Sequence, residues 1–223
     1  MSHPVAIRFE PFDAELLARA EGRIALIVPP EGAKGGAARR LDRLMRGALV
    51  RALASEAWGK LKAGESLEIG WPAGLACEAL QLVKLARRAT QAEARKAGAT
   101  VAKALGPKGV LLIAGAHPRA AEIAFGLALR AYRFDYHTAE KPGFGPVTMM
   151  VARPEEVAAE AAPHAALAEG VFFTRDLVNE PANILTTDDF AARLAAMQEL
   201  GLEVEILEEP DLEALGMRAL LGV

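Results

Sequence analysis

The chain has 223 residues, of which 52% are hydrophobic and 25% are charged, and its formal net charge is −3. This length holds one large or two small domains with a buried core, and the composition is ordinary for a globular protein. A single cysteine, Cys77, excludes an internal disulfide and a cysteine-based zinc site. No apolar run approaches the ~20 residues of a membrane-spanning helix. The first residues also lack the pattern of a signal peptide, so we expect a cytoplasmic protein without a membrane partner.

Strands and helices alternate over residues 1–150. Short apolar or alternating runs predict strands at residues 5–9, 24–28, 67–69, 79–85, 110–114 and 147–151. Apolar residues at helical spacing predict helices at residues 39–58, 91–105 and 118–132. This alternation predicts an α/β fold, with helices on the faces of a sheet. The first two strands are close enough in sequence to pair as a hairpin, so we expect the sheet to be mixed.

The charge changes sign along the chain. Residues 1–160 carry 23 Lys or Arg and 17 Asp or Glu, whereas residues 161–223 carry 3 and 12. Such a change indicates two structural units. We predict an N-terminal α/β domain over residues 1–155, a linker or short connecting helix over 156–163, and a second unit over 164–223.

The second unit has the pattern helix–helix–strand–helix. Thr186, or the residue after it, is placed to cap a helix in a capping box with Asp189. Residues 202–206 alternate like a half-buried strand, and Pro210 suits the first turn of a last helix. A single short strand cannot form a sheet by itself. We therefore expect residues 164–223 to belong to something larger, with the apolar sides of their helices uncovered.

Residue types that bind metals are scattered along the chain. The four histidines are isolated in sequence and are expected at the surface or at helix caps: His3, His117, His137 and His164. The acidic clusters at residues 188–189 and 208–211 precede predicted helices, where the helix dipole favours acidic side chains. These patterns predict solvated caps and not a metal site, which needs converging ligands.

Two other kinds of catalytic group are not supported. Cys77 lies in an apolar context that is typical of an inert buried thiol. The three serines are Ser2, Ser55 and Ser66, and none lies in a Gly-x-Ser-x-Gly motif, which argues against a serine hydrolase.

Two basic or glycine-rich segments could bind anions. Residues 32–36, Gly-Ala-Lys-Gly-Gly, stand between a predicted strand and a predicted helix, where phosphate-binding loops occur. The segment matches neither the dinucleotide motif nor the P-loop, so we expect a flexible surface loop. The helix predicted over residues 39–58 carries five arginines: Arg39, Arg40, Arg43, Arg46 and Arg51. We expect them to form a basic face that is exposed to solvent, and contact with nucleic acid is the alternative.

The most distinctive string covers residues 175–186, Arg-Asp-Leu-Val-Asn-Glu-Pro-Ala-Asn-Ile-Leu-Thr. Its polar residues and proline predict a helix C-terminus followed by a structured turn, with a role in contacting a ligand as the alternative. As a whole, the string resembles the segment that opens the catalytic domain of leucyl (cytosol) aminopeptidases. The resemblance is pronounced over residues 121–223, and it includes residues 130–135, 200–204 and 215–223.

This resemblance implies a two-part fold and a parent enzyme. A macro-domain-like N-terminal α/β domain, which mostly serves assembly, would precede the first helix–strand–helix elements of the catalytic domain. The family consists of cytoplasmic hydrolases, often homohexamers, that remove N-terminal residues from peptides with two divalent ions, zinc or manganese. The motifs that supply its metal ligands do not occur up to Val223. No catalytic, cofactor-binding or metal-binding residue is therefore assigned, and this chain by itself is expected to bind no metal and to be inactive.

Two hypotheses follow from the sequence. In the first, the chain is the front portion of a metalloaminopeptidase. In the second, it is a stand-alone binding or assembly module that contacts nucleic acid or a phosphorylated ligand through residues 39–58 or 32–36. The modest positive charge of residues 1–160 does not favour nucleic acid.

Overall fold

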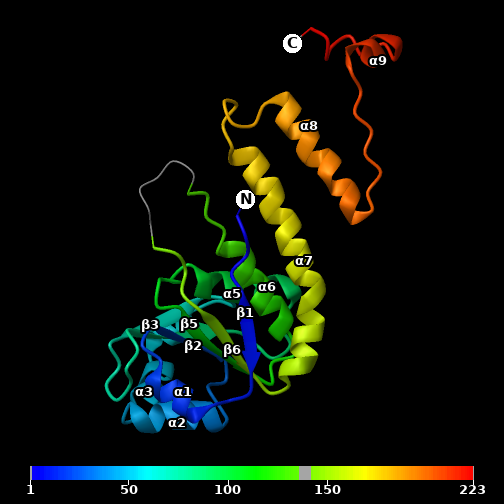
Figure 1. Cartoon of the computed structure of the whole chain (residues 1–223). Coiled ribbons are helices and arrows are strands. Elements are labelled where there is room, and N and C mark those ends of the chain that lie inside the picture. The colour runs from blue at the N-terminus through cyan, green and yellow to red at the C-terminus, as the bar shows by residue number, and fades with distance from the viewer. Residues whose placement is uncertain (1, 136–141, 223) are drawn as a thin grey trace. The chain divides into compact units, whose positions relative to one another are not determined.

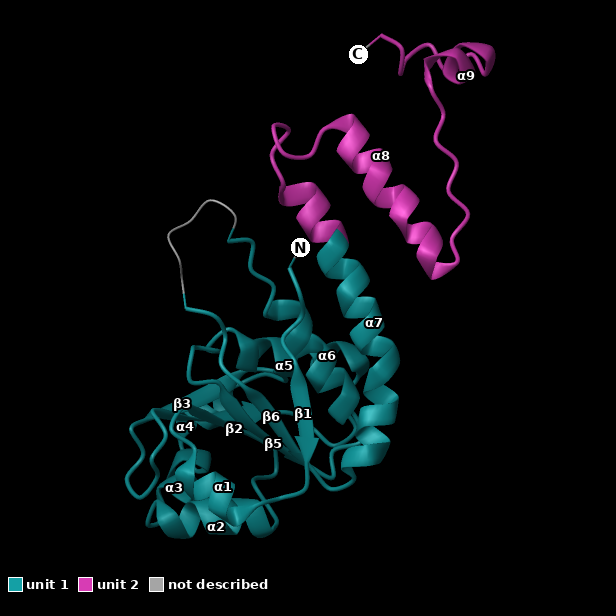
Figure 2. Cartoon of the chain, viewed as in Figure 1, with its two compact units in different colours: residues 1–173 teal, residues 174–223 magenta. Residues whose placement is uncertain are grey.

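The computed structural model describes residues 2–135 and 142–222, which fall into two compact units. Unit 1 covers residues 1–173 and unit 2 covers residues 174–223 (Figure 2). Each unit is described by itself.

A six-stranded sheet forms the centre of unit 1. Its strands are β1 (Ile7–Glu10), β2 (Arg23–Val28), β3 (Ser66–Gly70), β4 (Ala79–Lys84), β5 (Val110–Gly115) and β6 (Val147–Val151). Their order across the sheet is β1-β6-β5-β2-β4-β3 (Figure 1). Every neighbouring pair is parallel except β3 with β4. The predicted mixed α/β sheet is therefore confirmed.

The predicted hairpin between the first two strands is wrong. β1 pairs with β6, and Ile7 lies opposite Val147. β2 instead lies between β4 and β5. The reason is the short helix α1 (Ala14–Arg19), whose first turn is capped by the Asp13 carboxylate. A helix in the connection allows the chain to cross over and to enter β2 in the parallel direction.

Four short helices cover one face of the sheet. They are α1, α2 (Gly36–Leu44), α3 (Ala48–Leu53) and α4 (Glu56–Lys60). The last three replace the single helix that was predicted over residues 39–58. The break follows from two consecutive residues with positive φ, Arg46 at 51° and Gly47 at 81°, which no α-helix accommodates. Ser55 then caps α4 by accepting a hydrogen bond from the Trp58 amide.

Helices α5 (Gln91–Ala102) and α6 (Ala120–Arg130) cover the opposite face (Figure 1). They pack closely because glycines lie at their contact. A Cβ at Gly98 would lie 1.8 Å from the Ile123 carbonyl oxygen, and one at Gly126 would lie 2.0 Å from the Arg95 carbonyl oxygen. The apolar spacing that predicted this helix is confirmed, since Ile123 and Leu127 of α6 and Ala131 directly after it are buried.

Helix α7 runs without interruption from Pro154 to Asn179. Its alanine-rich sequence favours a helix, and Pro163 is tolerated inside it. Residues 156–163, expected to be a linker or a short connecting helix, lie within this long helix. Compact unit 1 extends along it to Phe173. The division into domains at 1–155 and 164–223 stays a prediction.

Unit 2 contains helices but no strand in the part that the structure describes. After the end of α7 come α8 (Thr187–Ala195), the 3-10 helix η1 (Ala196–Leu200) and α9 (Glu209–Ala214). The capping box of Thr186 with Asp189 and the place of Pro210 in the first turn of α9 are confirmed. The predicted strand at residues 202–206 is wrong, because a strand needs a partner and this segment has none among the described residues.

Candidate functional site

Among the described histidines, His3 and His164 line one small cavity, whereas His117 lies at the start of α6. In His117, Nε2 lies 3.1 Å from the Ala86 carbonyl oxygen, and Nδ1 accepts a hydrogen bond from the Arg119 amide at the start of α6. In His164, the ring stacks on Phe125 with centroids 4.9 Å apart. His117 thus confirms the expected capping role, whereas His164 packs against an aromatic ring. His137 lies outside the described residues.

The acidic clusters act as helix caps, as predicted. The Asp189 carboxylate accepts hydrogen bonds from the Thr186 hydroxyl at 2.6 Å and from the Thr186 amide at 3.2 Å. These two bonds hold the pKa of Asp189 below its usual value. Asp211 accepts a hydrogen bond from the Glu208 amide in the same way. Within residues 2–135 and 142–222, no three His, Cys, Asp or Glu side chains form a group that could hold a metal ion.

Cys77 is a buried thiol in the core of unit 1. Only 1% of its surface is exposed, and burial raises its pKa to about 11. Because the thiolate is the reactive form, this side chain is protonated and unreactive near neutral pH. The structure therefore confirms the prediction of an inert buried thiol.

The distinctive string of residues 175–186 forms the end of α7 and the turn that follows it. α7 ends at Asn179, and the Pro181 carbonyl oxygen accepts hydrogen bonds from the Ile184 and Leu185 amides at 2.9 and 3.0 Å. The Glu180 carboxylate pairs with Arg193 of α8 at 2.7 Å and raises the pKa of that guanidinium. The predicted helix C-terminus and structured turn are confirmed, and the ion pair connects them to α8.

The five arginines that were predicted on one basic helix lie on α2 and α3 and in the turn between these helices. All five are exposed. In this turn, the Arg51 guanidinium donates a hydrogen bond to the Arg46 carbonyl oxygen at 3.2 Å. Their exposure agrees with a solvated basic face.

Among the described helices, none is both long and apolar enough to cross a membrane.

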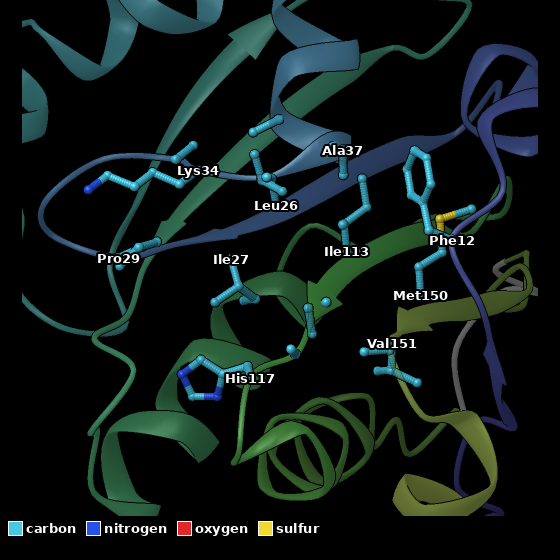
Figure 3. Close-up of a pocket in the computed structure, with 18 of the residues that line it drawn as sticks. Phe12, Leu26, Ile27, Pro29, Lys34, Ala37, Ile113, His117, Met150 and Val151 are labelled. Carbon is cyan, nitrogen blue, oxygen red and sulfur yellow. The ribbon is translucent and has the colours of Figure 1, made fainter.

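A cavity of about 780 Å³ opens at the carboxyl ends of the parallel strands of unit 1 (Figure 3). Five strands contribute its floor and walls, through residues at or just beyond their ends: β1, β2, β4, β5 and β6. These residues include Ile27 near the end of β2, Leu85 directly after β4, Gly115 at the end of β5 and Val151 at the end of β6. The glycine-rich segment 32–36 and the first turn of α2 form the remaining side.

The polar groups of this cavity are mostly cationic or neutral. Lys34 and Arg87 line it and are exposed, and the Arg87 guanidinium lies 3.4 Å from the Ala116 carbonyl oxygen. His117 also lines the cavity, and its pKa is lowered, chiefly by burial and further by the charges of Arg87 and Arg119. The imidazole is therefore neutral at pH 7 and retains its two hydrogen bonds.

One side of this cavity could be recognised in the sequence, since the glycine-rich segment 32–36 stands between a predicted strand and a predicted helix. The convergence of the strand ends could not be predicted, because it depends on the order of strands in the sheet. Alternation of strands and helices predicts a parallel sheet, but it does not specify which strands are neighbours.

Comparison with known proteins agrees with the resemblance of residues 175–186. A sequence model described as the cytosol aminopeptidase family, catalytic domain, matches residues 172–223. The whole chain aligns at 64% identity with a probable cytosol aminopeptidase of Cereibacter sphaeroides, over 46% of that protein's length. A probable cytosol aminopeptidase of Dinoroseobacter shibae is 53% identical over the whole chain and 46% of its own length.

Two solved structures share the fold. A mutant of tomato leucine aminopeptidase matches with a TM-score of 0.74 at 18% identity, over 97% of this chain and 47% of that one. The bottromycin maturation enzyme BotP, in complex with Mn, matches with a TM-score of 0.58 at 28% identity, over 88% of this chain and 40% of that one.

These features define a mixed α/β domain that is followed by residues of a peptidase catalytic domain. The predicted resemblance to the cytosol aminopeptidase family is confirmed. The chain spans about half the length of the curated relatives that it matches.

Proposed function

We propose that this chain is the front portion of a metal-dependent aminopeptidase that removes N-terminal residues from peptides in the cytoplasm. The observation that carries the proposal is the 64% identity to a probable cytosol aminopeptidase over the whole of this chain. The names of the relatives support peptide substrates and a cytosolic location. The manganese complex of BotP supports a divalent ion in the parent enzyme, which we expect to be manganese or zinc.

In this proposal the metal site lies in the part of the parent protein that the chain does not contain. Two divalent ions in such a site would activate a water molecule as the nucleophile and would polarise the scissile carbonyl. The described residues offer no cluster of metal ligands, so no catalytic step is assigned to them. Their roles are those of a scaffold: unit 1 serves assembly into a homohexamer, and unit 2 supplies the first elements of the catalytic domain.

The exposed apolar side chains of unit 2 support this scaffold role. None of the apolar residues described in this unit is buried. Large apolar side chains remain exposed along this unit, and they include Phe190 of α8, Leu202 after η1 and Leu215 after α9. Contiguous exposed apolar surface marks a site of contact with other protein. A larger catalytic domain would cover these side chains.

An activity assay tests the proposal directly. The 223-residue chain is incubated with a leucine anilide and Mn²⁺ or Zn²⁺, beside a protein from the same gene extended to the length of the relatives. We expect no release of product by the chain. The extended protein is expected to turn over the substrate and to lose that activity when a chelator removes the ions. Turnover by the chain itself, or none by the extended protein with either ion, would contradict the proposal.

The coding region beyond Val223 separates the two hypotheses that the sequence left open. A continuation that contains lysine, aspartate and glutamate metal motifs supports the aminopeptidase. A stop codon directly after Val223 would instead favour a stand-alone binding or assembly module.

A further inference from the structure

The cavity of unit 1 lies where open α/β sheets bind ligands. β2 leads into α2 on one face of the sheet, whereas its neighbour β5 leads into α6 on the other face. The chain therefore leaves these adjacent strand ends in opposite directions and opens a crevice between them. Ligands of such sheets bind in the crevice outside the carboxyl ends of the strands, at this point of divergence. The volume of about 780 Å³ is within the range of small-molecule sites.

One side of the cavity offers backbone N–H groups to an anion. α2 has nine residues, and no described side chain caps its N-terminus or places a carboxylate in its first turn. The amides of Gly36, Ala37 and Ala38 have no partner within the helix, because the first amides of any α-helix lack one. The cavity is lined by all three residues. A Cβ at Gly35 or Gly36 would meet no atom within 4 Å, so a ligand can approach this backbone closely.

The lining of the cavity also carries positive charge. Lys34 lies in the loop before α2, and Arg87 lies in the loop after β4. Among the described residues that line the cavity, Glu31 is the single carboxylate. Free helix amides, two cations and the positive end of the α2 dipole together favour an anion such as phosphate.

The other side is apolar and carries an exposed aromatic ring. Phe12 lines the cavity and is 44% exposed, although it is a large hydrophobic residue. Figure 3 shows Phe12 and Lys34 on opposite sides of the cavity. Between them, Leu26, Ile113 and Met150 form a buried apolar floor. An aromatic ring above an apolar floor suits a flat ring system that stacks against it.

We propose that this cavity binds a small phosphorylated ligand that carries a flat ring, a nucleotide-like molecule. The phosphate lies against the first turn of α2, between Lys34 and Arg87, and the ring lies against Phe12. This binding site goes beyond the peptidase function and does not depend on it, because every residue involved belongs to unit 1.

The test compares three probes on the 223-residue chain by isothermal titration calorimetry: AMP, adenosine and inorganic phosphate. AMP is expected to bind at least about tenfold more tightly than either of the other two, since it alone engages both sides of the cavity. Its affinity should fall as salt is added, because salt screens the exposed cations. Equal affinities for AMP and adenosine, or no AMP binding at millimolar concentration, would overturn the proposal.

Matched variants locate the binding. Lys34→Glu or Arg87→Glu should weaken AMP about tenfold and leave adenosine unchanged. Lys103→Glu makes the same charge change on an exposed side chain that does not line the cavity, and it should have no effect. An equal loss in Lys103→Glu would mean that AMP binds through general charge attraction and would overturn the proposal.

A second pair of variants tests the backbone amide and does not rely on charge. Gly36→Pro removes one N–H at the first helical position, where proline is tolerated. Gly36→Ala adds a side chain there but keeps the N–H. AMP should bind more weakly to Gly36→Pro than to Gly36→Ala, whereas equal binding would contradict the assigned place of the phosphate. Phe12→Ala should weaken AMP and adenosine together.

Discussion

The two compact units of the chain share helix-forming signals but differ in what they bury. In unit 1, both faces of the sheet are covered by helices, and the core contains fully buried side chains such as Ile24, Leu80 and Leu112. In unit 2, α8, η1 and α9 contain no buried residue. Capping is local and needs no tertiary partner, so the caps of unit 2 form as the sequence predicts. Strand pairing and apolar burial need a partner, and in unit 2 both are missing from the described residues.

Hydrogen exchange should show the largest difference between the units. Amides of α5, α6 and β5 are expected to exchange only through global unfolding, since their elements surround the core. Amides of α8 and α9 should exchange at least about 10³-fold faster, because few buried contacts oppose their local opening. Mass spectrometry of peptides from each segment measures the ratio.

A dilution series is the control for association between copies. If unit 2 covers its apolar side chains by binding a second copy of the chain, protection in α8 and α9 should rise with protein concentration. Protection equal to that of α5 in a monomeric chain would contradict the expectation that this segment is loosely held.

A substitution at the α5–α6 contact sharpens the comparison within unit 1. Gly98→Ala should lower the free energy of unfolding by about 2 kcal/mol, because its Cβ would meet the Ile123 carbonyl oxygen at 1.8 Å. Gly170→Ala is the matched control. Gly170 is exposed in α7 and a Cβ there meets nothing within 4 Å, so alanine should stabilise the helix by up to ~1 kcal/mol. Urea unfolding followed by circular dichroism measures both, and a shift of the same sign would contradict the proposed contact.

The sequence was most informative about features that depend on neighbouring residues. The capping box at Thr186 and the buried stripe of α6 follow from spacings of three or four residues, and both are present. The break of the predicted helix at Arg46 and Gly47 was missed, because its apolar spacing continues across the break. The apolar face survives the change in direction, since Leu41, Met45 and Leu49 are all buried.

Features that depend on residues far apart in the chain could not be predicted from the sequence. The pairing of β1 with β6 joins segments about 140 residues apart, and only the order of strands in the folded sheet reveals it. The cavity has the same origin, since Phe12, Leu85 and Val151 come together only at one edge of that sheet. The alternation at residues 202–206 matches the pattern of a strand, but the prediction was wrong because a pattern does not supply the neighbour that a strand needs.

The smallest expected effect concerns the acid stability of the cap of α8. The pKa of Asp189 is lowered by its hydrogen bonds with Thr186, relative to an ordinary value of 3.8. A carboxyl group whose pKa is depressed in the folded state stabilises that state fully above its ordinary pKa, and loses this contribution as the pH falls through the lowered value. The helical Cα chemical shifts of α8 should therefore decrease below pH 3.8. Asp189→Asn should remove this dependence, whereas Asp188→Asn, beside it in the first turn, should retain it. If both variants respond to pH alike, the general charge of the helix N-terminus accounts for the effect, and the hydrogen bond to Thr186 does not.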